Sequence, residues 1–277
     1  MTNGGAPYNI VKNLRTMNVD FALLLIGLIG NDFNGKWIID DCIKSNIDIN
    51  QLEITSCTNG LLDEKYFNFS ETNAKLFYLG PLTQLNRLDT FNNNDNKRTN
   101  ASKVLENTLL HGLETIVDFS SGKNIDYSHI AKSSLPFIDH LIINETEAGL
   151  IFTKNITSDN LYEIKQIAND LIDSGVRKTV TIHFTEGDIL MTNDKNLFLQ
   201  GSIVLREEFI KGSVEDGDTF VSGLIYGIHQ QWSLDKTLHL AVCIAAMSLS
   251  HESSTDGMKD IEQCLNLQKY GFRRLKI

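Results

Sequence analysis

Two kinds of hydrophobic pattern alternate along this chain. Short runs rich in Ile, Val and Leu lie near residues 20–26, 75–79, 114–118, 138–143, 178–184 and 188–192. Apolar runs of this length are typical of strands that are buried on both faces of a parallel sheet. The intervening segments predicted to be helices are 6–17, 32–45, 102–113, 159–174, 219–229 and 233–250. In most of them apolar residues recur three and four positions apart. The alternation predicts an α/β fold with a largely parallel central sheet and helices on its faces.

Two segments break this pattern. Residues 51–69 alternate between apolar and polar over short stretches, which predicts a small antiparallel flap standing off the main sheet. Residues 91–100 contain the run Asn-Asn-Asn-Asp-Asn and are predicted to be a solvated loop. No linker is long enough to separate independent domains. We therefore expect one domain over residues 1–277 with a flap at about 48–75.

Composition narrows the class of protein. The 277 residues are 42% hydrophobic, which is enough for a large core, and the net charge of −10 argues against nucleic acid as a partner. The four cysteines lie far apart, without the spacing of metal ligands, which indicates reduced, mostly buried thiols and a cytoplasmic protein. The longest apolar run, residues 21–30, is too short to cross a bilayer, so no membrane partner is expected.

The segment at 211–227 carries the clearest chemistry. A polar, glycine-containing stretch runs directly into a small-residue apolar helix. The first N–H groups of such a helix are unpaired and its dipole favours an anion, so a phosphate is expected there. Asp218 at the mouth would take a proton from an attacking hydroxyl while the amides hold the transferred phosphoryl group. The alternative interpretation is that Asp218 or Asp216 only caps the helix.

Several further motifs, in a fixed order along the chain, support the interpretation of 211–227 as a phosphate site. A Gly-Gly-Ala-Pro-Tyr-Asn turn at 4–9 is followed by the segments 25–35, 144–147 (Asn-Glu-Thr-Glu), 211–227 and 232–246. Together they resemble the PfkB-type, or ribokinase-like, carbohydrate kinases over nearly the whole chain. Segments at 77–80, 117–120, 183–187, 210–212 and 248–258 resemble one sugar-kinase branch of that family.

The resemblance implies a fold and an activity. The fold would be a three-layer α/β/α arrangement with a mostly parallel sheet and a small β flap that acts as a lid. The activity would be the phosphorylation of a hydroxyl of a small sugar or sugar-like substrate, with ATP and Mg²⁺ as cofactors. Lids in the family often pair between subunits, so a homodimer through the flap is expected if the flap exposes an edge.

The resemblance also assigns residues to the transfer of the phosphoryl group. Asp218 would be the catalytic base, and Gly217 with its neighbours Asp216 and Glu215 would form the anion hole.

At the start of the chain, Gly4, Gly5 and Asn9 match the sugar-binding turn of the family. In that turn small residues let the backbone approach the substrate and the Asn amide binds a hydroxyl. The alternative is a plain glycine-containing turn before a helix.

Four more segments would face the nucleotide. Asn144 and Glu147 match the Asn-x-x-Glu pair of the family, which helps to hold magnesium and the phosphates, with Glu147 acting on the metal through water. Asp118 ends a strand at the carboxyl edge of the sheet and is expected to face the phosphates. His183 and Gly187 lie where the family has its nucleotide loop. The alternatives are an exposed first-turn acid for Glu147 and a core residue for His183.

Three departures from the family pattern support a second interpretation. The family opens with a strand that carries a substrate-binding Asp, whereas three residues precede Gly4, and the flap is shorter than usual. The usual Gly-Ala-Gly-Asp of the anion hole reads Glu215-Asp216-Gly217-Asp218. A carboxylate about 6 Å from a phosphate charge costs roughly 3 kcal/mol at an effective dielectric of about 20. The alternatives are therefore a degenerate member that acts as a binding or structural protein and, second, a nucleoside kinase of the same family.

Overall fold

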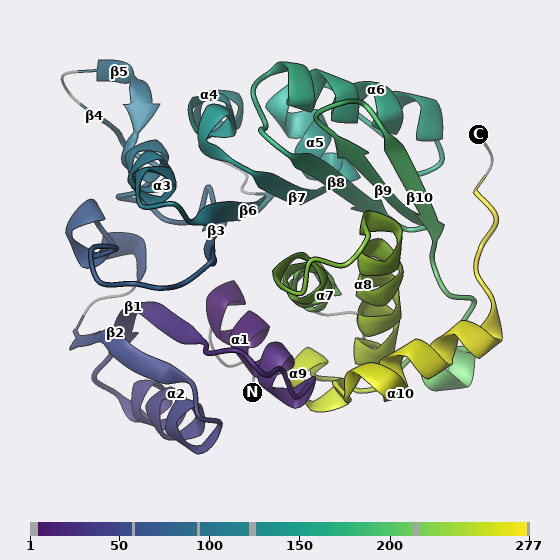
Figure 1. Cartoon of the computed structure of the whole chain (residues 1–277), viewed down its shortest axis with the longest axis horizontal. Helices are drawn as coiled ribbons and strands as arrows, with labels where there is room; N and C mark the ends of the chain where they lie inside the picture. Colours follow the sequence, from purple (N-terminus) through teal and green to yellow (C-terminus); the bar gives the residue numbers. More distant parts are fainter. Residues whose placement is uncertain (1–4, 57–58, 93–94, 122–125, 213–215, 276–277) are drawn as a thin grey trace.

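A central sheet of six strands organises the molecule. The computed structural model describes residues 5–56, 59–92, 95–121, 126–212 and 216–275. The strand order is β10-β9-β8-β7-β6-β3 (Figure 1). The strands are β3 (Leu76–Leu82), β6 (Glu114–Phe119), β7 (His140–Asn144), β8 (Thr179–Phe184), β9 (Gly187–Thr192) and β10 (Leu197–Gly201). The first four are parallel, and β9 and β10 are antiparallel to their neighbours, which confirms a mostly parallel sheet.

Helices cover both faces of this sheet (Figure 1). One face carries α3 (Asn100–Leu110), α4 (Tyr127–Ser134), α5 (Glu145–Ile151) and α6 (Leu161–Asp173). The other carries α1 (Ala6–Thr16), α7 (Asp216–His229) and α8 (Leu234–Ser248). The C-terminal elements are α9 (Ser254–Gly257) and α10 (Ile261–Leu265). The result is the predicted three-layer α/β/α arrangement.

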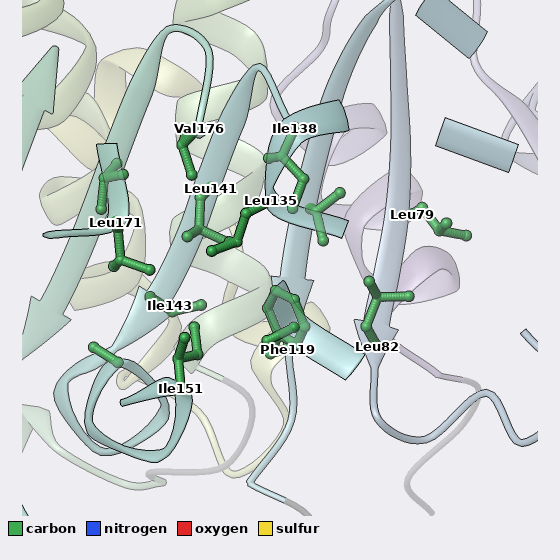
Figure 2. Close-up of a cluster of buried hydrophobic side chains, with 14 of the residues drawn as sticks. Leu79, Leu82, Phe119, Leu135, Ile138, Leu141, Ile143, Ile151, Leu171 and Val176 are labelled. Carbon is green, nitrogen blue, oxygen red and sulfur yellow. The ribbon is translucent and has the colours of Figure 1, made fainter. Parts of the chain in front are cut away.

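Each face has its own hydrophobic core. Leu79, Phe119, Leu141 and Ile143 belong to the core under α3–α6, where Figure 2 shows them gathered on the strands. Ile116 belongs to the other core, under α1, α7 and α8. Successive residues of β6 thus enter opposite cores, and this explains why the central strands read as unbroken apolar runs rather than as alternating ones.

The N-terminal strands correct the sequence prediction. Within the described residues, β1 (Leu24–Gly30) does not join the central sheet and pairs only with β2 (Asp48–Thr55), in a two-stranded sheet. The pairing is parallel, with α2 (Phe33–Lys44) between the strands, so the antiparallel flap expected over 51–69 is wrong. Two 3₁₀ turns, Asn59–Leu61 and Glu64–Tyr66, follow β2. Alternating polarity reports that one face of a strand is exposed, but it does not specify the direction of its partner.

Smaller differences complete the comparison. Residues 91–99 form a short antiparallel pair, β4 (Phe91–Asn92) and β5 (Asp95–Thr99), rather than a loop without strands. Cys42, Cys243 and Cys264 are buried and free, as expected, whereas Cys57 lies outside the described residues. Over the described ranges, no helix is long and apolar enough to cross a membrane.

Candidate active site

Segments far apart in the sequence meet where α1 packs against α7. The amide Nδ2 of Asn9 on α1 donates a hydrogen bond of 2.8 Å to Oδ2 of Asp218 on α7. Asn9 is 3% exposed, whereas Asp218 is half-buried, so the bond is partly shielded from water. α1 begins after Gly5, its N-cap, with Pro7 in the first turn, where a missing backbone N–H costs nothing. The structure therefore brings together the predicted base and the predicted sugar-binding Asn.

The position of Asp218 within α7 bears on the capping alternative. The helix begins at Asp216, so Asp218 stands in the first turn rather than at the N-cap position. Capping alone does not account for its bond to Asn9. Next to it, a Cβ added to Gly217 would meet no atom within 4 Å, which leaves open space beside the first amides of α7. Gly4 and Glu215 lie outside the described residues, as does the side chain of Asp216.

Asp118 lies near the carboxyl end of β6. Its Oδ1 atom is buried and has no hydrogen-bond partner. Burial raises the pKa of the Asp118 carboxyl well above its usual range, the Tyr78 hydroxyl opposes this rise, and the charges of Asp218 and Glu147 add to it. These influences show that the three carboxyl groups lie within electrostatic range of one another.

Glu147 is built into the start of α5. Its Oε2 accepts from the backbone N–H of Asn144 at 3.0 Å, and its own N–H donates to Asn144 Oδ1 at 2.8 Å. Ser121 Oγ donates to Oε1 at 3.2 Å. Glu147 is 7% exposed, so the alternative of an exposed first-turn acid is wrong. Burial raises its pKa to about 7 despite these donors, and the carboxylate therefore gains from a nearby cation.

His183 and Gly187 lie on the β8–β9 hairpin. The His183 ring stands 5.3 Å from that of Phe220 on α7, and burial lowers the His183 pKa to about 4. The imidazole is therefore neutral at pH 7 and brings no positive charge to a phosphate. A Cβ on Gly187 would lie 2.4 Å from the carbonyl oxygen of Gln200, so the close approach of β9 to β10 accounts for this glycine.

The side chains of Tyr78 and Ser121 also belong to this region, although the sequence analysis gave them no role. Ser121 contacts Glu147, and its only sequence signal is a pair of serines directly after a buried strand. The Tyr78 hydroxyl is buried, and after burial the charges of Asp118 and Asp218, a hydrogen bond to Asp118 and the charge of Glu147 raise its pKa.

The acids present suit a hydrated magnesium ion better than a directly chelated one. Across the described ranges, no group of three or more His, Cys, Asp or Glu side chains is arranged to hold a metal. The unpaired Oδ1 of Asp118 is an acceptor without a donor, and the Glu147 oxygens keep lone pairs beyond their two bonds. Mg²⁺ commonly keeps several waters and uses one or two carboxylates together with substrate phosphates. The residues therefore fit the ion that the sequence analysis expected.

Comparison with known proteins decides the family. Residues 1–261 match the model of the pfkB family of carbohydrate kinases. The chain belongs to this family. The family assignment confirms the predicted class of enzyme, a phosphotransferase that uses ATP to phosphorylate a carbohydrate, and the ribokinase-like fold.

Individual relatives of this pfkB protein are distant. A 5-dehydro-2-deoxygluconokinase of Clostridium beijerinckii is 22% identical, over 96% of this chain and 84% of its own length. A putative ribokinase II of E. coli, solved with ATP and Mg²⁺, superposes with a TM-score of 0.76 at 14% identity, over 96% of this chain and 88% of that one. A nucleoside kinase of Burkholderia thailandensis, solved with inosine, superposes with a TM-score of 0.72 at 18% identity, over 98% of this chain and 89% of that one. Sugar and nucleoside kinases thus share this fold.

Proposed function

We propose that this protein uses ATP to phosphorylate a hydroxymethyl group of a small sugar or sugar-like substrate, with Asp218 as the catalytic base. The observation that carries the proposal is the 2.8 Å bond from Asn9 Nδ2 to Asp218 Oδ2. An amide donor favours the ionised form of a carboxylate and fixes its direction, which are the two properties a base needs. Asn9 comes from the segment expected to bind the sugar, so the base stands beside the substrate.

The start of α7 is the proposed phosphate site. Gly217 has open space where a side chain would otherwise stand, so a phosphoryl oxygen is able to approach the amides of the first turn. Those amides and the helix dipole stabilise the negative charge that is spread over the transferred group. Asp218 lies one residue on, and this places the base at the attacking side of the same group.

Asp118 and Glu147 are the residues proposed to hold hydrated Mg²⁺. Their carboxyl groups lie within electrostatic range of each other and of Asp218. Bound Mg²⁺ would neutralise charge on the β- and γ-phosphates, which an acidic protein does not otherwise supply. Asn144 and Ser121 orient Glu147, and the neutral His183 contributes at most a hydrogen bond.

Replacing the base tests the proposal. In a panel of sugars with radiolabelled ATP, Asp218→Asn should lower kcat by about 10²- to 10⁴-fold, because the hydroxyl loses its proton acceptor. The fold and Mg-ATP affinity should be kept, as measured by circular dichroism and calorimetry. Asp159→Asn, an exposed turn residue, is the matched control and should behave as wild type.

The same experiments separate the alternatives. Equal transfer rates for Asp218→Asn and wild type would show that Asp218 is not the catalytic base. A wild type that binds no Mg-ATP until Glu215→Gly and Asp216→Ala are introduced would instead identify a degenerate member. Transfer of the phosphoryl group to nucleosides but to no sugar of the panel would show that the protein is a nucleoside kinase.

We also propose that the β1–β2 unit is a lid and a site of homodimerisation in a cytoplasmic enzyme. Among the described residues, β2 pairs with β1 alone, so one of its edges is available to a second copy. Sedimentation analysis should give a dimer that Lys introduced along β2 dissociates. A monomeric wild type would contradict this.

A further inference from the structure

An irregularity in β3 lies directly opposite Asp118. Leu79 pairs with Val117 and Leu82 pairs with Phe119, so two residues of β3, Gly80 and Pro81, face the single residue Asp118 of β6. Ser120 N donates to Leu82 O at 3.1 Å, so pairing resumes after the bulge. Bulges of this kind are found next to active sites, where they re-aim a side chain.

Gly80 provides the space in which the Asp118 carboxyl sits. A Cβ on Gly80 would lie 1.7 Å from Asp118 Oδ1 and 2.8 Å from its Cγ. The φ angle of Gly80 does not demand glycine, because it lies outside the left-handed region. The absence of a side chain therefore matters here for contact with Asp118 and not for the backbone conformation.

The Tyr78 hydroxyl reaches the same place. It lies 2.6 Å from the position that a Cβ on Gly80 would take, so Tyr78 Oη and Asp118 Oδ1 both lie next to the space beside Gly80. Both atoms are buried, and among the described residues neither has a partner at good hydrogen-bond geometry, although the Tyr78 hydroxyl interacts with the Asp118 carboxyl as a donor and opposes the rise of its pKa. Tyr78 packs against the core beneath α1 and α7, the two helices that carry Asn9 and Asp218. Leaving a buried hydroxyl unpaired costs free energy, so its place beside a carboxyl needs a reason.

We propose, on the basis of the function proposed above, that Tyr78 and Gly80 are positioning residues that hold the Asp118 carboxyl in place beside Asp218 and Glu147. The bulge turns Gly80 toward Asp118, and the hydroxyl borders the carboxyl from the same strand. Neither Tyr78 Oη nor Asp118 Oδ1 is open to solvent, and the Gly80 backbone lies against both. The Tyr78 hydroxyl therefore acts on the reaction through Asp118, without touching the sugar.

Steady-state kinetics in two backgrounds test this role. Tyr78→Phe removes the hydroxyl alone and should lower kcat about 3- to 30-fold while KM for the sugar stays within twofold. In an Asp118→Asn background the same change should cost less than twofold, because the group it positions is already altered. Thr237→Val is the matched control: it removes a buried hydroxyl of α8 that has no partner among the described residues, and it should leave kcat within twofold of wild type.

Unfolding measurements give a readout that does not depend on activity. Gly80→Ala places a methyl group against Asp118 and should lower the urea midpoint clearly. Most of that loss should disappear when Asp118→Ala and Tyr78→Phe remove the atoms in the way. A Gly80→Ala loss that is equal in both backgrounds would show that the bulge does not hold Asp118.

The kinetic outcomes keep this inference separate from the proposed function. If wild type transfers phosphate and Tyr78→Phe loses kcat equally with and without Asp118, or raises KM for the sugar instead, the positioning role is wrong and the proposed function stands. If Thr237→Val loses as much kcat as Tyr78→Phe, the positioning role is also wrong. If wild type transfers no phosphate, the proposed function fails together with the role in transfer, and the unfolding cycle still decides whether β3 holds Asp118.

Discussion

Asp118, Glu147 and Asp218 are three neighbouring carboxyl groups in three different surroundings. Asp118 is buried beside a tyrosine, Glu147 is bonded within a helix cap, and Asp218 accepts from a side-chain amide. Burial favours the neutral acid and donors favour the carboxylate. Burial thus raises the pKa of both Asp118 and Glu147, and donors oppose the rise at each.

At the opposite end of the strands, Glu114 gives a pH-dependent prediction. It bonds His140 Nε2 at 3.0 Å and Lys178 Nζ at 2.7 Å, and these partners lower its pKa to about 2. A lowered carboxyl pKa stabilises the fold above the unfolded value of 4.5, and that contribution is lost as the pH falls from 4.5 toward 2. Glu114→Gln should therefore lower the free energy of unfolding by about 1 kcal/mol at pH 7, a figure reduced for solvent screening.

Urea unfolding at pH 7, 5 and 3 measures this difference. It should shrink between pH 5 and pH 3. Glu106→Gln removes the surface partner of Arg98 and is the control, with an expected loss below about 0.5 kcal/mol at pH 7. A Glu114→Gln deficit that stays constant over this pH range would contradict the prediction.

Sequence patterns point to some residues of the candidate site and not to others. Asn9 and Asp218 were predicted from segments near opposite ends of the chain, and the structure places them in contact. Tyr78 had no such signal, because its importance arises from a bulge that places it and Gly80 against Asp118. A residue that belongs to a local sequence motif can be predicted from the sequence, whereas a contact that depends on how two strands pair cannot.

At the scale of the elements, α7 and α8 pack closely against each other. A Cβ on Gly223 of α7 would lie 2.6 Å from Cα and 3.1 Å from Cβ of Ala241 on α8. Helix propensity alone would make Gly223→Ala stabilising by about 1 kcal/mol. The collision should reverse the sign and cost about 2 kcal/mol, because both helices must separate to admit the methyl group. Chemical denaturation measures the change, and a more stable variant would contradict it.

The elements also show which structure can be predicted. The buried strands β3, β6, β7, β8 and β9 were found because burial on both faces leaves an apolar run. The direction of β2 was missed, since β1 is its partner through a helical crossover and strand direction is a property of the pair. The short helices α4 and α5 were missed as well, because seven or eight residues carry little periodicity.

For the whole molecule, the net charge of −10 sets a condition on nucleotide binding. Under the proposed function, ATP approaches the carboxylates of Glu147 and Asp218, and these charges repel its phosphates unless Mg²⁺ accompanies it. Mg-ATP at a hundred times its Kd should stabilise the fold by about 2.7 kcal/mol and raise Tm by about 5 °C. ATP with a chelator should raise Tm by less than half of this, which thermal unfolding measures. Equal shifts with and without Mg²⁺ would exclude a role for the cation in binding.

The bond between Asn9 and Asp218 spans 209 positions of the chain. During synthesis the first helix leaves the ribosome long before the helix that carries Asp218, so for most of that time Asn9 has no carboxylate to bind. This contact forms only after Asp218 has been made, so a shorter chain that already contains the strands of the central sheet still lacks the base proposed here. The contact between Asn9 and Asp218 therefore forms late in the synthesis of this protein, once its N-terminal helix has packed against α7.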